Sequence, residues 1–232
     1  MIQMKKIPDK SIDLILCDLP YGVSDCKWDI ALPFPELWEQ YRRVIKDNGA
    51  TVLFSIQPFT TALIHSNRKD FRYCWYWKKN NITGFTFARY QPMRCIEDIC
   101  VFYKKAPTYN PQGLIKLRKP SRYRHKGKMS VYKNEKSLNG EGESIYGNYP
   151  RHLLEFKNDA TGSRSRLHPT QKPVALLEYL IKTYTNEGQT VLDNCMGSGS
   201  TGVAAKHTGR NFIGIELSEH YFNIAKQRIE TS

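Results

Sequence analysis

Apolar residues fall into short, nearly continuous runs along the chain, and stretches with the spacing of an amphipathic helix separate these runs. Residues 12–17 and 50–55 form the first two runs, which are typical of strands buried on both faces of a sheet. Residues 35–46 have helical periodicity, and Asn48-Gly49 predicts the end of that helix. The elements predicted in the same way further along are helix 58–67, strands 71–78 and 96–103, helix 173–185, strand 190–194, helix 200–208, strand 212–216 and helix 219–229. Strands that alternate with helices predict an α/β fold, with a doubly wound, mostly parallel sheet and helices on both of its faces.

The alternation stops between residues 105 and 167. This region is rich in Lys, Arg, Gly, Ser, Tyr and Asn, and it has little apolar periodicity. We therefore predict an insertion placed on a core, and we expect three parts: residues 1–104 and 168–232 as the two halves of the core, and residues 105–167 as the insertion between them.

The charge of the chain is strongly positive and unevenly distributed. The sequence has 35 Lys and Arg residues against 22 Asp and Glu residues, a net charge of +13. Residues 104–133 contain ten of the cations and no acid, interleaved with tyrosines. This pattern is the electrostatic footprint of a protein that binds a phosphate backbone, although a solvated basic loop without a partner would have the same composition. The side chains predicted to contact phosphates are Lys116, Arg118, Lys119, Arg122, Arg124, Lys126 and Lys128.

Several classes of protein are disfavoured by what the sequence lacks. A run of 18 apolar residues is missing, so no membrane span is expected, and the first residues have no apolar signal core. The six cysteines include no C-x-x-C pair, which favours reduced thiols in a cytoplasmic protein. His168 has no partner at the spacing of a metal ligand, so no metal site is expected.

A glycine-rich turn follows the predicted strand 190–194. Residues 197–202 read Gly-Ser-Gly-Ser-Thr-Gly, and Glu216 closes the next strand. This arrangement is typical of nucleotide-binding doubly wound folds, in which the acid binds a ribose. A turn that serves only helix packing is one alternative. A nicotinamide-dependent oxidoreductase is another, but it would need a second half-fold after the glycines, where only residues 203–232 remain.

A second group of residues with chemical potential ends the first strand. Asp18-Leu19-Pro20-Tyr21 lies where ligands bind in parallel sheets, at the carboxyl edge. The acid can accept a hydrogen bond, proline fixes the direction of a backbone carbonyl, and tyrosine can stack on a planar ring. The alternative is a strand-end turn with a buried tyrosine.

These segments together resemble a known family. Asp18-Leu19-Pro20-Tyr21 resembles the D-P-P-Y signature of the amino-methyltransferases that modify exocyclic amines of DNA bases. Residues 191–202 resemble the S-adenosylmethionine-binding motif of that family, and residues 168–173, His-Pro-Thr-Gln-Lys-Pro, are similar to the segment before it. Arg94-x-x-Glu97-Asp98 also resembles a family element. The order, with the catalytic motif first, the insertion next and the cofactor motif last, is that of the β-class, and the resemblance covers almost the whole chain.

The resemblance implies a Rossmann-like methyltransferase with S-adenosylmethionine as cofactor and DNA as substrate, of the kind found in restriction–modification systems. It implies direct methyl transfer to the exocyclic N6 of adenine, since an acidic first motif residue is typical of adenine enzymes, with cytosine N4 as the alternative. The implied catalytic residues are Asp18, Leu19, Pro20 and Tyr21. The implied cofactor-binding residues are Asp18, Thr170, Lys172, Asp193, Gly197, Gly199 and Glu216.

Two departures from the family pattern change what is expected. Leu19 stands where the family has its first proline, but Leu also supplies the backbone carbonyl that the chemistry uses. Family members have a further strand before the segment that corresponds to residues 4–13, so we expect a sheet of six core strands. The residues alone leave open RNA or protein as substrate, a non-catalytic DNA-binding protein, and a homodimer.

Aromatic residues are concentrated in two neighbouring stretches. For residues 71–77 we expect packing within the sheet, as is common for aromatic side chains in strands. Residues 80–92, which include Phe85 and Phe87, adjoin the predicted catalytic edge and are equally compatible with packing and with stacking on bases.

Overall fold

A computed structural model describes residues 2–22, 32–125, 140–157 and 171–232. The chain divides into two compact units, one of residues 1–110 and 152–232, the other of residues 111–151. The second unit lies within the predicted insertion 105–167, and the residues on either side of it group with the first unit.

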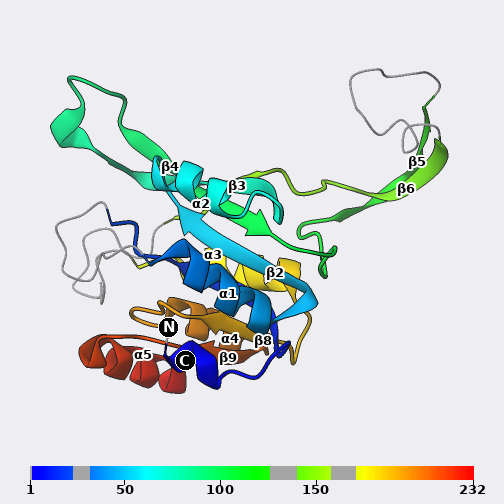
Figure 1. Cartoon of the computed structure of the whole chain (residues 1–232). Coiled ribbons are helices and arrows are strands. Elements are labelled where there is room, and N and C mark those ends of the chain that lie inside the picture. The colour runs from blue at the N-terminus through cyan, green and yellow to red at the C-terminus, as the bar shows by residue number, and fades with distance from the viewer. Residues whose placement is uncertain (1, 23–31, 126–139, 158–170) are drawn as a thin grey trace. The chain divides into compact units, whose positions relative to one another are not determined.

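The first unit is built on a seven-stranded sheet (Figure 1). Its strands, in spatial order, are β7 (Leu153–Glu155), β3 (Phe71–Thr83), β4 (Arg94–Phe102), β2 (Ile45–Ser55), β1 (Ile12–Asp18), β8 (Thr190–Asp193) and β9 (Asn211–Gly214). The β4 strand runs antiparallel to both of its neighbours, and the other pairs are parallel. The predicted α/β fold with a mostly parallel sheet is therefore confirmed.

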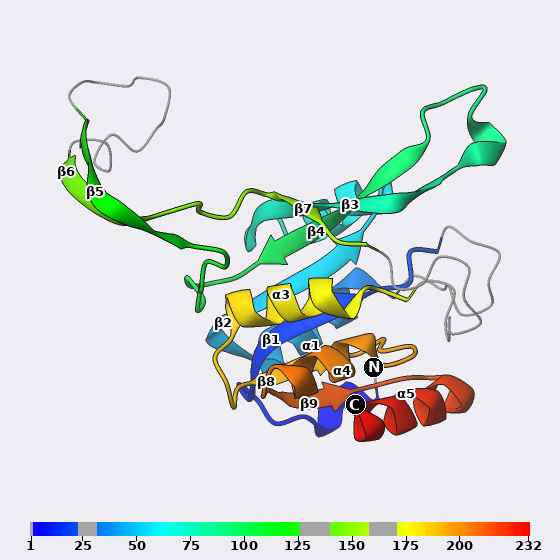
Figure 2. The same ribbon diagram turned by 180° about the vertical axis from the view of Figure 1, so that it is seen from behind.

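Helices cover both faces of this sheet (Figures 1 and 2). The helices on one face are α1 (Phe34–Val44) and α2 (Phe59–Ser66). On the other face lie α3 (Val174–Tyr184) and α4 (Ser200–His207), and α5 (Glu219–Thr231) packs against α4. The central strands are buried on both sides, as their continuous apolar runs require: Val52 and Phe54 of β2 face α3, whereas Leu53 faces the α1 side.

Two features of the core differ from the sequence-based expectation. The helix predicted over residues 35–46 ends at Val44, and β2 begins at Ile45 and includes Asn48-Gly49, the predicted stop of the helix. Gly49 is needed for strand packing and does not cap the helix, because a Cβ atom there would lie 2.8 Å from the backbone oxygen of Asp13 in β1. The sheet also has seven strands where six were expected. The additional β7 lies in the stretch predicted as insertion, and Leu154 is buried in the core.

The second unit is an antiparallel pair of strands, β5 (Ile115–His125) and β6 (Gly140–Gly147). The pairing register shifts between Lys116 and Ser121, so the strands do not show the simple alternation that reveals a strand in sequence. Arg122 forms an exposed ion pair with Glu143 of β6, at 2.6 Å. Folding thus places Arg122, which belongs to the acid-free stretch 104–133, next to an acid of β6.

Candidate functional site

Polar side chains from distant parts of the chain meet at one edge of the sheet. Asp18 ends β1 and Asp193 ends β8, and parallel strands place both residues at the carboxyl edge. Because β4 is antiparallel, its early residue Glu97 reaches the same edge. Lys172, which lies directly before α3, completes the group.

Both carboxylate oxygens of Asp18 are held by hydrogen bonds. The Tyr21 hydroxyl donates to Oδ1 at 2.6 Å, and the Lys172 ammonium donates to Oδ2 at 2.6 Å. Leu19 is 3% exposed, so its side chain packs into the core and leaves only its backbone for chemistry at the strand end. The geometry fixes the orientation of the Asp18 carboxylate.

Tyr21 is half-buried and packs against an aromatic neighbour. Its ring centroid lies 5.0 Å from that of Phe59, so part of the ring surface predicted to stack on a base already has a partner. Burial, reinforced by the negative charge of Asp18, raises the pKa of Tyr21 well above its ordinary value. The phenol therefore stays protonated and acts as a donor to Asp18.

An ion-pair chain extends from Asp18 across the sheet edge. Lys172 Nζ lies 3.4 Å from Glu97 Oε2, and Lys79 Nζ of β3 lies 3.0 Å from Glu97 Oε1. Burial alone would lower the pKa of Lys172, but the charges of Asp18 and Glu97 outweigh it and raise the pKa to about 12. Burial would raise the pKa of Glu97, but Lys172 and Lys79 outweigh it and lower that pKa. Lys172 and Glu97 are thus both charged at neutral pH.

The structure places Lys172 on a carboxylate, whereas the sequence predicted it only as a cofactor contact. Glu97 and Lys79 were absent from the predicted site residues. The sequence held a signal for Glu97, in the family-like Arg94-x-x-Glu97-Asp98, but none for Lys79.

The turn after β8 is held by two acids. Asp193, 3% exposed, accepts hydrogen bonds from the Cys195 backbone N–H at 3.0 Å and from the Thr201 hydroxyl at 2.7 Å. Glu216 accepts one from the Gly197 backbone N–H and one from the Ser218 backbone N–H, each at 2.9 Å. The predicted ribose ligand Glu216 therefore also ties the glycine-rich turn to the start of α5.

Gly199 has a packing role that its sequence motif does not reveal. Its φ is +79°, and a Cβ atom there would lie 2.8 Å from the Ala225 Cβ atom and 3.0 Å from the Ala225 Cα atom of α5. At Gly199 the structure thus shows the close approach of a helix, and the cofactor contact that the family resemblance implies for this glycine stays a prediction.

Replacing Gly199 with Ala is expected to lower the free energy of unfolding by roughly 2–4 kcal/mol, because positive φ strain and overpacking add. Gly188→Ala is the matched control, since Gly188 has φ +77° and no atom within 4 Å of the added Cβ. That variant should lose only the strain of about 1–2 kcal/mol. Urea unfolding measures both. Equal losses in the two variants would contradict the packing role.

The stability of the chain is expected to depend on pH through Asp193. Burial raises the pKa of Asp193 to about 6, although hydrogen bonds from Thr201 and Cys195 oppose the shift. The folded state therefore favours the protonated acid. Its contribution to stability is fully present below about pH 4 and is lost as the pH rises through about 6, by up to about 3 kcal/mol.

The measurement is the free energy of unfolding of the protein and of Asp193→Asn between pH 4 and pH 7. The asparagine variant lacks this titration. As the pH rises, the free energy of unfolding of the wild-type protein should fall relative to that of Asp193→Asn. A difference that does not change with pH would contradict the assignment.

The structure places the predicted DNA contacts only in part. Lys116, Arg118, Lys119 and Arg122 are exposed on β5 of the second unit, and Arg124 belongs to the same strand. Lys126, Lys128 and the predicted cofactor contact Thr170 lie outside the described residues. Two further cations of the basic stretch, Lys104 and Lys105, lie in the first unit and pair with Asp47. The basic stretch is therefore not one uniform surface.

Two other kinds of site are absent from the described residues. No group of three or more His, Cys, Asp or Glu side chains in these residues has the arrangement of a metal site. Among the helices of the described ranges, none is long and apolar enough to cross a membrane.

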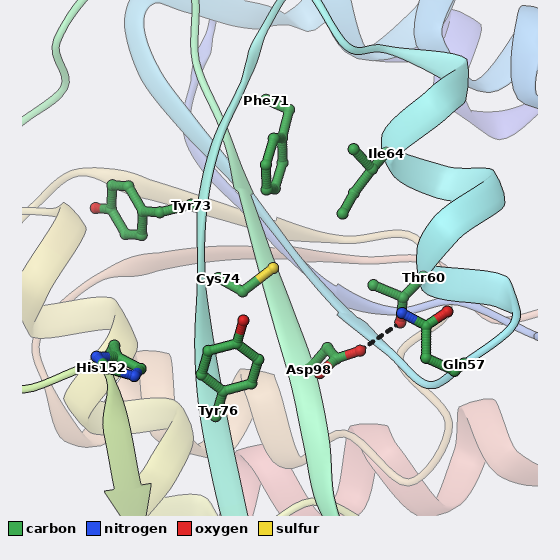
Figure 3. A pocket seen from close by; sticks show the side chains of 9 residues that line it. All are labelled: Gln57, Thr60, Ile64, Phe71, Tyr73, Cys74, Tyr76, Asp98 and His152. Carbon is green, nitrogen blue, oxygen red and sulfur yellow. Dashed lines mark hydrogen bonds between the residues drawn. The ribbon is translucent and has the colours of Figure 1, made fainter. Parts of the chain in front are cut away.

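Apart from this edge, a hollow lies beside α2 (Figure 3). It has a volume of about 600 Å³, and Asp98 on its floor accepts a hydrogen bond from Thr60 at 2.7 Å. Its remaining lining residues are Gln57, Ile64, Phe71, Tyr73, Cys74, Tyr76 and His152. Because successive residues of a strand face opposite sides, Glu97 belongs to the site at Asp18 and Asp98 to this hollow.

Known proteins are similar to this chain in sequence and in fold. The family model described as "DNA methylase" (N6_N4_Mtase) matches residues 12–227. Type II methyltransferase M2.DpnII of Streptococcus pneumoniae is 54% identical, over 98% of this chain and 85% of its own length. DNA adenine methyltransferase YhdJ of Escherichia coli strain K12 is 28% identical, over 100% of this chain and 81% of its own length. The crystal structure of an M1.HpyAVI–SAM complex is 27% identical over 98% of this chain and 92% of that chain, with a TM-score of 0.61.

Proposed function

The chain belongs to the N6/N4 DNA methylase family, and we propose that it transfers the methyl group of S-adenosylmethionine to the exocyclic N6 of adenine in DNA. The observation that carries the proposal is the oriented carboxylate of Asp18 at the end of β1. It lies at the sheet edge where the turn held by Asp193 and Glu216 begins.

The amino nitrogen of a base is a weak nucleophile, because its lone pair is delocalised into the ring. Asp18 would accept one amino hydrogen, and the backbone carbonyl of Leu19 or Pro20 would accept the other. Two such acceptors favour a tetrahedral nitrogen with its lone pair directed at the methyl group. Tyr21 and Lys172 fix the carboxylate before the base arrives, so little reorganisation is needed during the reaction. As the new N–C bond formed, the bond between the methyl group and sulfur would break and leave its electron pair on the sulfur, and the proton lost by the nitrogen would pass along its hydrogen bond to Asp18 or to water.

The residues at the glycine-rich turn fit S-adenosylmethionine. When bound, this cofactor supplies a methyl group on a positively charged sulfur. Gln171 Oε1 is buried without a hydrogen-bond partner among the described residues, and it would accept from the ammonium group of the cofactor. Asp193 is buried with no ion-pair partner in the described part of the chain, so a cationic ligand would offset the cost of its charge. Glu216 retains acceptor capacity for ribose hydroxyls. The SAM complex of M1.HpyAVI supports the same cofactor here.

Adenine is preferred to cytosine on two grounds. An acid precedes Leu19-Pro20-Tyr21, and the similar YhdJ is named a DNA adenine methyltransferase. The hydrogen-bonding argument alone would serve the N4 amine of cytosine equally well. Cytosine N4 is therefore kept as an outcome of the test.

The basic strand β5 is proposed to hold the DNA backbone. Phosphate contacts position a duplex without specifying its sequence, and the exposed cations of β5 suit that role. The base must leave the duplex to reach Asp18, because the amine inside a base pair is not accessible to such a site. A DNA substrate accords with the cytoplasmic location predicted from the sequence. A homodimer stays a prediction.

Two measurements test the proposal. S-adenosylmethionine should raise the melting temperature of the protein, whereas NAD should not, because only a ligand that binds the folded state stabilises it. DNA from cells that express the protein, sequenced with detection of modified bases, should carry methylated adenine in one sequence context. Stabilisation by NAD alone, or DNA without any modified base, would overturn the proposed function.

A further inference from the structure

An extended hairpin projects beyond the sheet between β3 and β4. Both strands continue beyond the part of β4 that pairs with β2, and they still pair with each other at Thr83 and Arg94. Figures 1 and 2 show the connection reaching away from the sheet on the side where β1 ends. Its tip contains the 3₁₀ helix η2 (Phe85–Phe87). Nothing in the proposed chemistry uses this hairpin.

The tip presents large apolar side chains to solvent. Phe85 is 81% exposed and Tyr90 is 86% exposed, while Phe87 and Ile82 are more than half exposed. A cluster of this kind is unusual on a soluble surface and marks a site of interaction. The sequence allowed either packing or stacking on bases for this stretch, and the exposed rings argue against packing.

The backbone of the tip is ordered by its own hydrogen bonds. The Phe87 backbone N–H donates to Gly84 at 3.0 Å, and those of Tyr90 and Gln91 donate to Phe87 at 2.9 and 3.0 Å. Successive turns therefore hold the aromatic rings outward before any partner arrives. A rigid aromatic tip loses little conformational entropy when it inserts into another molecule.

The charge around the tip favours a polyanion. Residues 78–94 include no acid. Lys78 and Lys79 are paired with Glu155 and Glu97. Arg89 and Arg94 form no ion pair or side-chain hydrogen bond with any residue that the structure describes, and both are exposed. Aromatic rings beside unpaired arginines are the combination that binds stacked bases and phosphates together.

The hairpin is joined to the candidate active site by the ion-pair chain. Lys79 contacts Glu97, Glu97 contacts Lys172, and Lys172 contacts Asp18. The tip therefore extends from the same edge at which a target base would be held.

We infer that the β3–β4 tip is the element that separates the target base from its neighbours, with Phe85 and Tyr90 entering the base stack of the DNA. This inference rests on the proposed function. Apolar side chains that enter base steps unstack them, and a ring in the vacated space would keep the base from returning. Arg89 and Arg94 would contact the adjoining phosphates.

The test uses two duplexes that contain the sequence context found methylated in expressing cells. One is fully paired, and the other has an abasic site opposite the target base, which removes the base pair that must be broken. For Phe85→Ala/Tyr90→Ala, kcat/KM on the paired duplex should fall by ~10-fold or more, on the scale of losing base–aromatic stacking. On the abasic duplex it should stay within about threefold of wild type, because less unstacking is required.

Tyr109→Ala is the matched control. Tyr109 is 46% exposed and packs near Tyr184, at the end of α3 on the opposite edge of the sheet. Both duplexes should be methylated as by the wild type. Equal losses on the two duplexes for the double variant, or no loss on the paired duplex, would overturn the inference. A wild-type protein that methylates neither duplex would overturn the proposed function itself.

Discussion

Replacing Asp18 with Ala should reduce methyl transfer at least ~100-fold, the scale of removing one well-placed polar group from a transition state. Asp18 supplies the carboxylate of the strand-end motif, and hydrogen bonds from Tyr21 and Lys172 fix its orientation. Without it, the target amine loses an acceptor at the moment when its nitrogen becomes tetrahedral. The affinity for S-adenosylmethionine should fall much less, because Asp193, Glu216 and Gln171 are unchanged.

Single-turnover methylation and calorimetric titration with S-adenosylmethionine measure the two effects separately. The fold should survive, since Lys172 keeps Glu97 as a partner in the variant. Asp70→Ala is the matched control: Asp70 pairs with Arg42 at the start of β3, on the opposite edge of the sheet. An Asp18→Ala protein with a rate within about threefold of wild type would contradict the catalytic assignment, given the expected scale of the loss.

The second large effect is expected on DNA binding. Replacing the five cations of β5 with Ala should weaken binding to duplex DNA and flatten its salt dependence. The residues are Lys116, Arg118, Lys119, Arg122 and Arg124. The slope of log affinity against log salt should fall by up to ~0.9 for each phosphate contact removed. The affinity for S-adenosylmethionine should hardly change.

The structure predicts an order within this set. Arg122 already pairs with Glu143, so its loss should reduce the slope less than the loss of Arg118. Lys104→Ala/Lys105→Ala is the matched control, because these lysines pair with Asp47 and lie outside the second unit. Fluorescence anisotropy with labelled duplex at several salt concentrations gives the slopes. A slope that stays unchanged in the five-residue variant would show that β5 is a solvated basic strand that makes no phosphate contacts.

The sequence predicted the parts of the fold that local pattern decides. Residues 12–17 and 50–55 are strands because an apolar run needs burial on both sides, and the central strands of the sheet supply it. Three-residue β7 carries too few positions for a pattern. It is fixed by its pairing with β3 and by the hydrogen bond from Trp77 Nε1 to the Phe156 carbonyl oxygen. The β5–β6 pair is hidden by its register shift.

The candidate site was predictable only where motifs mark it. Asp18 and Asp193 follow from strand ends and from the family resemblance. The bond between Lys172 and Asp18 joins residues 154 positions apart, and no local pattern reports such a contact. Lys79 enters the site only because the antiparallel β4 places Glu97 at the carboxyl edge, and strand direction is a property of the whole sheet.

The central claim is methyl transfer to the amino group of a DNA base at Asp18. Its most direct test is incubation of DNA with the protein and S-adenosylmethionine that carries an isotopically labelled methyl group, followed by mass spectrometry of the nucleosides. We predict label in N6-methyladenine with the wild-type protein and none above background with Asp18→Ala. Label in N4-methylcytosine alone would mean that the target base is cytosine, and the mechanism at Asp18 would stay the same. DNA without label in any nucleoside would contradict the claim.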